Sequence, residues 1–257
     1  IPAAGKDPVF AESPKSMIKV GRQTILDHQV ERLKKAGLTN NKVCVVRGHE
    51  GSQFTRADVE YLDNDSYLDT GSAYSLFCAE EAMTDGFLLL YSDILFDEGL
   101  MQRLLETEGD IVLLLDKSYR YHAHDVNKRL DLVLTDRTDS SHPRNLAVDS
   151  LLNISRIGKQ TPVQDNAYEF VGIALFSEKG SAILRRVYRD AQTRNPSPFH
   201  ESPSFNQSGF VDIIQEIIGE GHQVSGLEVS NGWIEIHERI DVDQAEKELQ
   251  IVQPSRS

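Results

Sequence analysis

Small residues and a lysine near the start of the chain have the types and spacing of a polyphosphate-binding loop. Ile1-Pro-Ala-Ala-Gly5 reads as the end of a strand that runs into a glycine, and Pro14-Lys15 follows after a loop. A loop of small residues lets backbone N–H groups approach a phosphate without interference from a Cβ. Lys15 could fold back over the same phosphates, and Lys6 lies beside the loop. The alternative is a tight turn with surface lysines.

An aspartate follows an apolar run in the middle of the chain. The run covers residues 87–90 and leads into Tyr91-Ser92-Asp93. An aspartate at the carboxyl end of a buried strand lies in the crevice where open α/β sheets bind ligands. A carboxylate in that position suits Mg²⁺, which binds to one or two carboxylates together with phosphate oxygens. The alternative is an N-cap for the next segment.

A third candidate lies near the end of the sequence, in Trp233-Ile-Glu235-Ile-His237. Glu235 and His237 share a face if this segment is a strand, because side chains alternate along a strand. Glu235 could then complete a metal site with Asp93. The alternative is a pair of exposed polar residues on an edge strand.

The elements that must position these residues alternate along the chain. Short apolar segments alternate with segments of helical periodicity, which predicts an α/β fold, a three-layer sandwich with a mainly parallel, mixed central sheet. Thr24 and Ser177 are predicted helix caps. We predict strands over 43–46, 59–62, 87–91, 111–115, 130–134, 151–154, 171–176 and 233–236, and helices over 25–36, 72–83, 99–107, 177–189, 209–218 and 242–252.

The organisation indicates one domain over residues 1–257. Its second half is elaborated at about 117–208, and this part would form the side that binds a second small molecule, called the acceptor below. Residues 136–144 read as an exposed turn. The chain starts abruptly, as if Ile1 were the last part of a strand, so excision from a longer multidomain chain is one interpretation. Lys117, Tyr119 and Arg120 follow the strand predicted over 111–115, where cations could hold an anionic acceptor; the alternative is a basic surface turn.

The charge distribution favours a small anionic ligand. The net charge is −13, which argues against general nucleic-acid binding. Residues 1–50 nevertheless hold nine Lys and Arg against five Asp and Glu, whereas the rest holds eighteen against thirty-five. No apolar run has the length of a membrane span, and Cys44 and Cys78 in apolar segments indicate a reducing cytoplasm.

Together these segments resemble the nucleotidyltransferase family that includes sugar-phosphate nucleotidylyltransferases and bacterial cholinephosphate cytidylyltransferases. The family pattern is a strand, Ala-Ala-Gly, a short loop, then Pro-Lys and a helix. The likeness continues through VCVVRGH, DNDSYLDTGSAYSLFCAEEA and YSDILF, and resumes at WIEIHERID. The resemblance implies a nucleotide-diphospho-sugar transferase-like, Rossmann-like fold and an enzyme that moves a nucleoside monophosphate.

The finer likeness is to the cytidylyltransferase domains associated with phosphoenolpyruvate mutases, through VVRGH, YSDILFD and DIVLLLDKSYR. It implies transfer of CMP from CTP to a 2-hydroxyethyl- or 2-aminoethylphosphonate, with release of pyrophosphate, in phosphonate biosynthesis. Fusion behind a mutase domain would explain the start at Ile1, and a homodimer is compatible with the sequence. Scarce aromatic residues favour such acceptors over choline phosphate, because a choline group calls for an aromatic cage.

The resemblance also implies roles for individual residues. Lys15 and Asp93 would be catalytic, with Lys15 between the α-phosphate and the incoming anion. Mg²⁺ would be bound by Asp93 and Glu235, with His237 beside them, and the acceptor by Lys117, Tyr119 and Arg120. The nucleotide would be bound by Pro2, Ala3, Ala4, Gly5, Lys6, Asp63, Asn64, Ser72, Tyr74 and Ser75.

Two positions depart from the family pattern. Lys6-Asp7-Pro8 stands where the family has a second glycine and an arginine, and Lys6 cannot reproduce the bidentate geometry of arginine. His237 stands where cholinephosphate enzymes have an aspartate. The alternatives are a cholinephosphate cytidylyltransferase, a sugar-1-phosphate nucleotidylyltransferase, a glycosyltransferase of similar fold, and a non-catalytic nucleotide-binding regulatory domain.

Overall fold

The computed structural model describes residues 1–121, 130–136 and 151–252. Apart from Asp136, the exposed turn predicted over 136–144 lies outside these residues. None of the described helices is both long enough and apolar enough to cross a membrane.

A small parallel sheet carries the N-terminal loop. Its strands are β1 (Pro2–Ala3), β4 (Cys44–Arg47) and β5 (Glu60–Asp63), in the order β1-β4-β5. Helix α1 (Ile25–Lys35) packs against them, and its Leu26 and Val30 share a buried cluster with Ala3 and Val45. The sheet thus fixes the strand from which the Gly5 loop departs.

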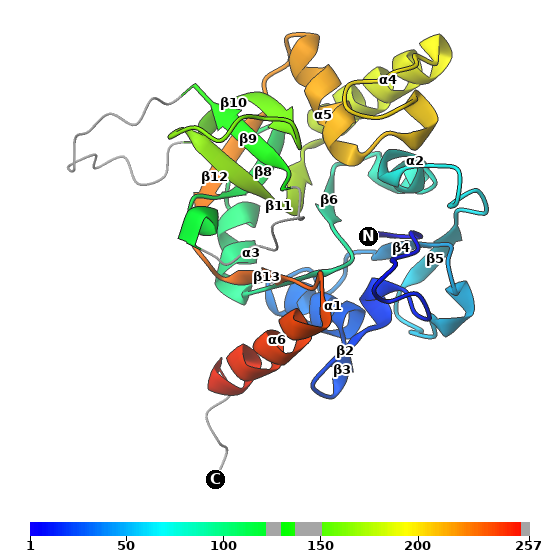
Figure 1. Cartoon of the computed structure of the whole chain (residues 1–257), viewed down its shortest axis with the longest axis vertical. Coiled ribbons are helices and arrows are strands. Elements are labelled where there is room, and N and C mark those ends of the chain that lie inside the picture. Colours follow the sequence, from blue (N-terminus) through cyan, green and yellow to red (C-terminus); the bar gives the residue numbers. More distant parts are fainter. Residues whose placement is uncertain (122–129, 137–150, 253–257) are drawn as a thin grey trace, which may run out of the picture.

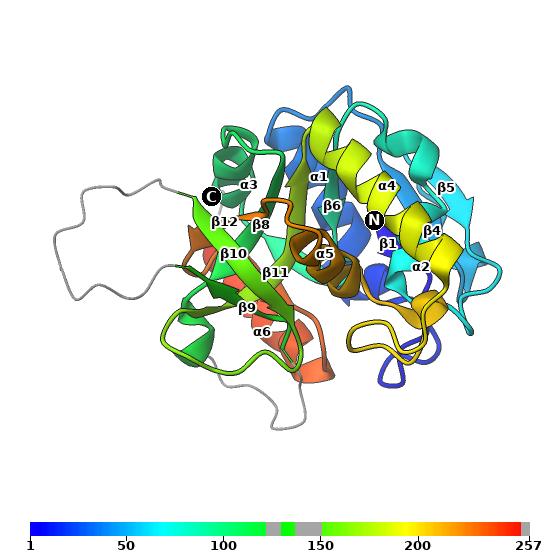
Figure 2. The same cartoon turned by 90° about the horizontal axis from the view of Figure 1, so that it is seen from above.

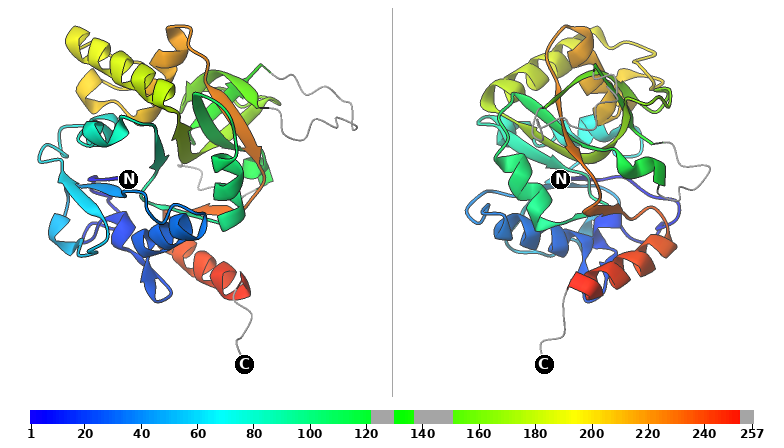
Figure 3. Two further views of the ribbon diagram at one scale, coloured as in Figure 1. Left: turned by 180° about the vertical axis from the view of Figure 1, so that it is seen from behind. Right: turned by 90° about the vertical axis from the view of Figure 1, so that its left-hand side faces the viewer.

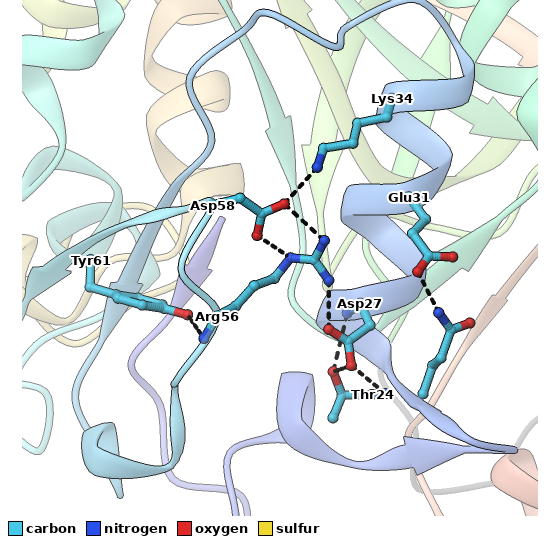
Figure 4. Close-up of polar contacts among 8 residues, drawn as sticks. Thr24, Asp27, Glu31, Lys34, Arg56, Asp58 and Tyr61 are labelled. Atoms are coloured by element: carbon cyan, nitrogen blue, oxygen red, sulfur yellow. Dashed lines mark hydrogen bonds and ion pairs between the residues drawn. The ribbon is translucent and has the colours of Figure 1, made fainter.

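Polar contacts cap the first turn of α1 and join one face of the helix to the segment before β5, as Figure 4 shows. Thr24 and Asp27 form the capping box at its first turn, which confirms the predicted cap. Arg56, in the segment before β5, donates to Asp27 Oδ1 at 2.7 Å and to Asp58 Oδ2 at 3.0 Å. Lys34 in the last turn contacts the same Asp58 oxygen at 2.6 Å. This network joins α1 to the approach to β5.

A larger sheet of six strands makes up the middle of the molecule (Figure 1). Its order is β6-β11-β8-β12-β10-β9. The strands are β6 (Phe87–Leu90), β11 (Ala167–Phe176), β8 (Ile111–Asp116), β12 (Ser225–Val229), β10 (Leu152–Gly158) and β9 (Leu132–Thr135). Strand β11 is antiparallel to β6, β8 and β9, whereas β8 and β12 are parallel.

The α/β class is confirmed, but this sheet has less parallel character than the sequence predicted. The strands of the small sheet are parallel, while most described pairings of the large sheet are antiparallel. All six residues of β8 and nearly all of β11 are buried. A strand buried on both faces is an unbroken apolar run in either orientation, so its hydrophobic pattern does not encode direction.

Helices cover both faces of β8, which establishes the predicted three layers. Leu113 and Leu115 belong to the same buried cluster as residues of α4 (Glu178–Arg194) and α5 (Phe210–Gly219). Val112 and Leu114 point the other way and pack with α3 (Glu98–Leu105). Figure 2 shows α4 and α5 beside each other, with α3 on the other side of the strands. Ser177 caps α4, as predicted.

A two-stranded ribbon joins distant parts of the chain. Strand β7 (Ile94–Phe96) pairs antiparallel with β13 (Trp233–Glu235). Helix α6 (Arg239–Val252) follows and lies against the hairpin of β2 (Lys19–Val20) and β3 (Gln23–Thr24), as both views of Figure 3 show. The ribbon therefore brings the C-terminal part of the chain next to the Asp93 segment.

The segment around α2 (Ser72–Phe77) differs from the sequence prediction. The helix predicted over 72–83 ends at Phe77, and a 3-10 turn (Glu80–Met83) follows. Leu76, Ala79 and Met83 still face the core. Their spacing of three and four residues suits either arrangement, which is why the pattern did not reveal the break. Strands β7 and β12 were not predicted.

Candidate active site

A cleft of about 330 Å³ opens where the N-terminal loop, the end of β6 and the starts of α2 and α5 meet. That volume lies at the small end of the range for ligand pockets. The cleft is lined by residues 2–7, 15, 67, 70–72, 75, 91–93, 131, 159 and 209–211. Both N-terminal candidates and Asp93 are therefore in one cavity, as the sequence predicted.

Lys15 lies between two carboxylates. Its Nζ is 3.1 Å from Asp93 Oδ2 and 3.2 Å from Asp7 Oδ2, and its side chain is only 14% exposed. Burial lowers the pKa of Lys15, but the charges of Asp93 and Asp7 more than offset this, so that the pKa lies above its usual value. Lys15 is thus a fixed cation in the cleft.

Asp93 faces a second carboxylate from the end of the chain. Glu235 is opposite Ile94 in the ribbon, and the Ile236 N–H donates to the Asp93 carbonyl at 2.9 Å. Burial and the charge of Glu235 raise the pKa of Asp93, while Lys15 opposes the shift. Glu235 is not among the lining residues, yet it lies close enough to act on Asp93. Two half-buried carboxylates therefore act on each other electrostatically here.

This pair could hold a divalent cation. The described residues contain no group of three His, Cys, Asp or Glu side chains arranged as metal ligands. Mg²⁺ does not need such a group, because it is usually held by one or two carboxylates with substrate phosphates and water. Asp93 and Glu235 offer hard oxygen donors and mutual repulsion that a cation would relieve, so they fit Mg²⁺. The backbone N–H of His237 donates to Asp241, and its side chain does not line the cleft.

The N-terminal loop presents its backbone to the cleft. The cleft lining includes the five residues predicted to bind the nucleotide from this segment, a role that stays a prediction: Pro2, Ala3, Ala4, Gly5 and Lys6. A Cβ at Gly5 would meet no atom within 4 Å, so the space beside it is open to a ligand. The missing family glycine and arginine are replaced by a closed turn, in which Asp7 Oδ1 accepts from the N–H groups of residues 9 and 10 at 2.8 and 3.1 Å.

The predicted base-binding residues divide into two groups. Ser72 and Ser75 line the cleft, whereas Asp63, Asn64 and Tyr74 do not. The buried Asn64 donates to Ser75 Oγ and to Thr70 Oγ1, each at 3.0 Å, and so holds two lining hydroxyls. Asp63 is paired with Arg47 at 2.6 Å. The roles of these residues toward a nucleotide remain predictions.

The three residues predicted to bind the acceptor lie outside the cleft lining. Tyr119 is buried, and Arg120 donates to its hydroxyl at 3.3 Å and is 3.7 Å from Asp165. The Lys117 N–H donates to the Val229 carbonyl. The structure thus gives the side chains of Tyr119 and Arg120 protein partners. Acceptor binding by Lys117, Tyr119 and Arg120 stays a prediction.

The sequence pattern missed two charged residues of the cleft, Asp131 and Lys159. Asp131 precedes β9, and its carbonyl accepts from the Phe170 N–H at 2.8 Å. Lys159 follows β10, and its N–H donates to Glu201 at 2.7 Å. Neither belongs to a local motif. They reach the cleft through antiparallel pairings that the sequence pattern does not reveal.

Comparison with known proteins identifies the family of the chain. Residues 1–150 match the model of the MobA-like NTP transferase domain. The CTP:phosphoglutamine cytidylyltransferase of Campylobacter jejuni is 22% identical over 253 residues, which cover 93% of this chain and 94% of that protein. The choline-phosphate cytidylyltransferase of Streptococcus pneumoniae is 26% identical over 93 residues, 35% of this chain and 40% of that protein.

The fold has close counterparts among solved structures. The structure of the CTP:phosphocholine cytidylyltransferase from Streptococcus pneumoniae superposes with a TM-score of 0.65, at 17% identity, and the match covers 96% of each chain. The family match spans more than half of the chain and includes the Gly5 loop, Lys15 and Asp93. This chain therefore belongs to the MobA-like NTP transferase family and is a nucleotidyltransferase.

Proposed function

We propose that this protein transfers CMP from CTP to a small phosphonate, of the 2-hydroxyethyl- or 2-aminoethylphosphonate type, and releases pyrophosphate. The observation that carries the proposal is Lys15, a half-buried cation held in the cleft beside the Gly5 loop and the Asp93 carboxylate. The two curated relatives named above are both cytidylyltransferases, and the first is matched over nearly its whole length. This supports CTP as the donor.

The chemistry is an in-line displacement at the α-phosphorus. An ionised oxygen of the acceptor forms a bond to that phosphorus, the bond to the bridging oxygen of the β-phosphate breaks, and pyrophosphate leaves with that electron pair. The attacking oxygen already carries its charge at neutral pH, so the protein need not remove a proton. Catalysis then consists of positioning and charge stabilisation, as in other phosphoryl transfers.

Different residues of the cleft would bind the phosphates, the incoming anion and the metal ion. Backbone N–H groups of the Gly5 loop, with Lys6, bind the β- and γ-phosphates, and Lys15 bridges the α-phosphate and the incoming anion. For this, Lys15 exchanges its contact with Asp7 or Asp93 for phosphate oxygens. Asp93 and Glu235 would hold Mg²⁺, which when bound would neutralise charge on the triphosphate.

The test is a matrix of donors and acceptors. Pyrophosphate release is measured with each of the four common nucleoside triphosphates against 2-aminoethylphosphonate, 2-hydroxyethylphosphonate, phosphocholine and glucose 1-phosphate, with Mg²⁺. We expect turnover with CTP and with the phosphonates above the phosphate esters. Turnover with phosphocholine alone, or with a sugar phosphate and another nucleotide, would contradict the phosphonate assignment. CTP binding without turnover on any acceptor would indicate a regulatory nucleotide-binding domain.

A further inference from the structure

Asp131 is a carboxylate in the cleft that the proposed chemistry does not use. It lines the cleft together with Lys15 and Asp93. Its Oδ1 is fully buried and has no hydrogen-bond partner among the described residues. Burying a carboxylate oxygen without a partner is costly, so such groups usually meet a ligand or a functional partner. A hydrogen-bond donor or a cation would therefore bind favourably at Asp131 Oδ1.

The surroundings of Asp131 are mainly acidic. Lys159 attracts its charge from a distance, without an ion pair between them, while Glu235, Glu201 and Asp212 repel it. Glu201 and Asp212 have partners of their own. Glu201 accepts from the N–H groups of residues 159 and 160, and Asp212 accepts from Gly209 and residues 201 and 202. Among these acids, Asp131 is the one with a buried carboxylate oxygen that has no hydrogen-bond partner among the described residues.

Two aromatic side chains line the same cleft as the Asp131 carboxylate. Tyr91 and Phe210 line the same cleft, and Phe170, whose N–H binds the Asp131 carbonyl, has its ring 5.6 Å from that of Tyr91 and 5.9 Å from that of Phe210. Carboxylates and aromatic faces together attract an alkylammonium group. A second divalent cation suits the position less well, because it needs several oxygen ligands and Lys159 lies near.

We infer that Asp131 binds a cationic ammonium group at the distal end of the acceptor, so that the acceptor is a zwitterion with its anion at Lys15 and its cation at Asp131. The inference rests on the proposed function, and it selects the aminoethyl over the hydroxyethyl type of acceptor. It assigns acceptor specificity to Asp131, in place of the residues that follow β8.

The test compares acceptors that share the phosphonate and differ at the distal group. CMP transfer from CTP is measured with 2-aminoethylphosphonate, 2-hydroxyethylphosphonate and ethylphosphonate, for the wild type and for Asp131→Asn. We expect the variant to lose roughly 30-fold or more in kcat/KM with 2-aminoethylphosphonate, the scale for loss of one partner of a buried charge pair. Its kcat/KM with ethylphosphonate should stay within about 3-fold. Phosphocholine as a fourth acceptor separates a primary from a quaternary ammonium.

The control is Asp190→Asn, which removes the same charge from the exposed face of α4. It should leave kcat/KM unchanged for every acceptor. An equal loss for all acceptors, or no loss, overturns the inference. If Asp131→Asn does not fold, the comparison of acceptors with the wild-type protein remains a test. Equal kcat/KM for 2-aminoethylphosphonate and ethylphosphonate would then overturn the inference. If no acceptor is turned over, the proposed function fails, and calorimetric binding of the same two phosphonates then tests Asp131 alone.

Discussion

Lys15 is the residue on which the site depends most directly. Its ammonium group is held within 3.2 Å of two carboxylates from different segments, and its position is fixed before any ligand arrives. A preorganised charge stabilises a transition state more than a flexible one does, because no reorganisation is needed during the reaction. The exchange of carboxylate for phosphate contacts at this nitrogen would couple donor binding to the release of Asp7 or Asp93.

Lys15→Ala should therefore lower kcat by about 10²-fold or more, the scale for loss of one such electrostatic contact. The measurement is the rate of pyrophosphate release at saturating CTP. Lys19→Ala is the matched control, because Lys19 is exposed on β2 and should leave the rate unchanged. Near-normal turnover in the Lys15 variant would remove this residue from the mechanism.

The titration of Asp131 predicts a pH dependence. Burial raises its pKa to about 6, with Lys159 opposing the shift and the other neighbouring acids adding to it. These acids are Glu235, Glu201 and Asp212. Below about pH 6 the carboxyl group is neutral and cannot attract an ammonium group. The ratio of kcat/KM between wild type and Asp131→Asn, measured with 2-aminoethylphosphonate, should be greatest above pH 7 and fall as the pH is lowered through 6.

Using one acceptor for both proteins cancels the titration of the acceptor itself. A ratio that stays constant between pH 5 and 8 would show that the charge of Asp131 does not contribute. The pKa of Asp131 should be lower in the complex than in the free enzyme, because the bound ammonium group favours the ionised carboxylate. The corresponding change in kcat should thus occur at a lower pH than the change in kcat/KM.

Among the elements, α1 holds the Asp93 segment in place through a single side chain. The amide of the fully buried Gln29 donates to the carbonyls of Tyr91 at 2.7 Å and Ile94 at 2.8 Å. These carbonyls flank Ser92-Asp93, so that Gln29 fixes the backbone on both sides of the carboxylate. In the proposed mechanism it would act through Asp93, as a positioning residue.

Gln29→Met keeps the size of the side chain and removes both donors. We expect the half-saturating Mg²⁺ concentration to rise about tenfold or more, because residues that orient a metal ligand commonly have effects of this size. Gln102→Met on the exposed face of α3 is the control. A variant with lower thermal stability but unchanged Mg²⁺ dependence would reduce Gln29 to a structural role.

The network around Arg56 stabilises the position of α1 in a pH-dependent way. Hydrogen bonds from Arg56 and Lys34 hold the pKa of Asp58 well below its usual range. Burial raises the pKa of Asp27, but bonds from Thr24 and Arg56 more than offset this. Both carboxylates have a lower pKa in the folded state than in the unfolded state, where it is about 4. Their contribution to stability is therefore present above about pH 4 and is lost as the pH falls below it.

Arg56→Met should lower the free energy of unfolding by about 1 kcal/mol at pH 7, since the pairs are partly exposed. The difference from wild type should shrink at pH 3. Denaturant titration at both pH values measures it, and Lys42→Met, which removes an exposed pair with Glu60, should cost nearly nothing. An undiminished difference at pH 3 would show that packing of the Arg56 side chain, and not its charge, is responsible.

The sequence predicted elements whose signals are local and missed those that depend on pairing. Thr24 caps α1 because its hydroxyl and Asp27 lie three residues apart, and such spacing is visible in any sequence. Strand β12 was missed because Ser225 and Gly226 interrupt its apolar pattern, and tertiary pairing with β8 decides its conformation. Gly226 suits the close packing there, since a Cβ would lie 2.2 Å from Leu115 Cδ1 and would force that side chain to move.

The same division applies to the candidate site. Gly5, Lys15 and Asp93 follow strands or short motifs and were found from their spacing. Asp131 and Lys159 could not be found in this way, because nothing near them in the sequence marks a ligand site. Their proximity follows from β9 and β10 pairing in an antiparallel sheet, which is a property of the folded chain.

At the scale of the whole molecule, one ligand would connect segments far apart in the chain. The cleft wall extends from residue 2 to residue 211, and the site also includes Glu235. A ligand that binds the folded state stabilises it by about 2.7 kcal/mol at a concentration one hundred times its Kd. For a chain of this size each kcal/mol corresponds to roughly 2–4 °C in Tm.

CTP with Mg²⁺ at that excess should therefore raise the Tm of the wild type by about 5–10 °C. The increase should be much smaller for Lys15→Ala, at the same ligand concentrations, because the triphosphate loses a main contact. Differential scanning fluorimetry measures both proteins in one experiment. An equal increase in both would mean that the nucleotide binds without the help of Lys15.

The pairing of β7 with β13 has a consequence for the order in which the enzyme becomes active during synthesis. Asp93 leaves the ribosome long before Glu235, and the two carboxylates meet only when residues 233–235 pair with residues 94–96. Until then the nascent chain contains the Gly5 loop and Asp93 but not the second carboxylate, Glu235. If Glu235 holds Mg²⁺ as proposed, the first turnover would follow the synthesis of β13, and shorter products of synthesis would lack this part of the site.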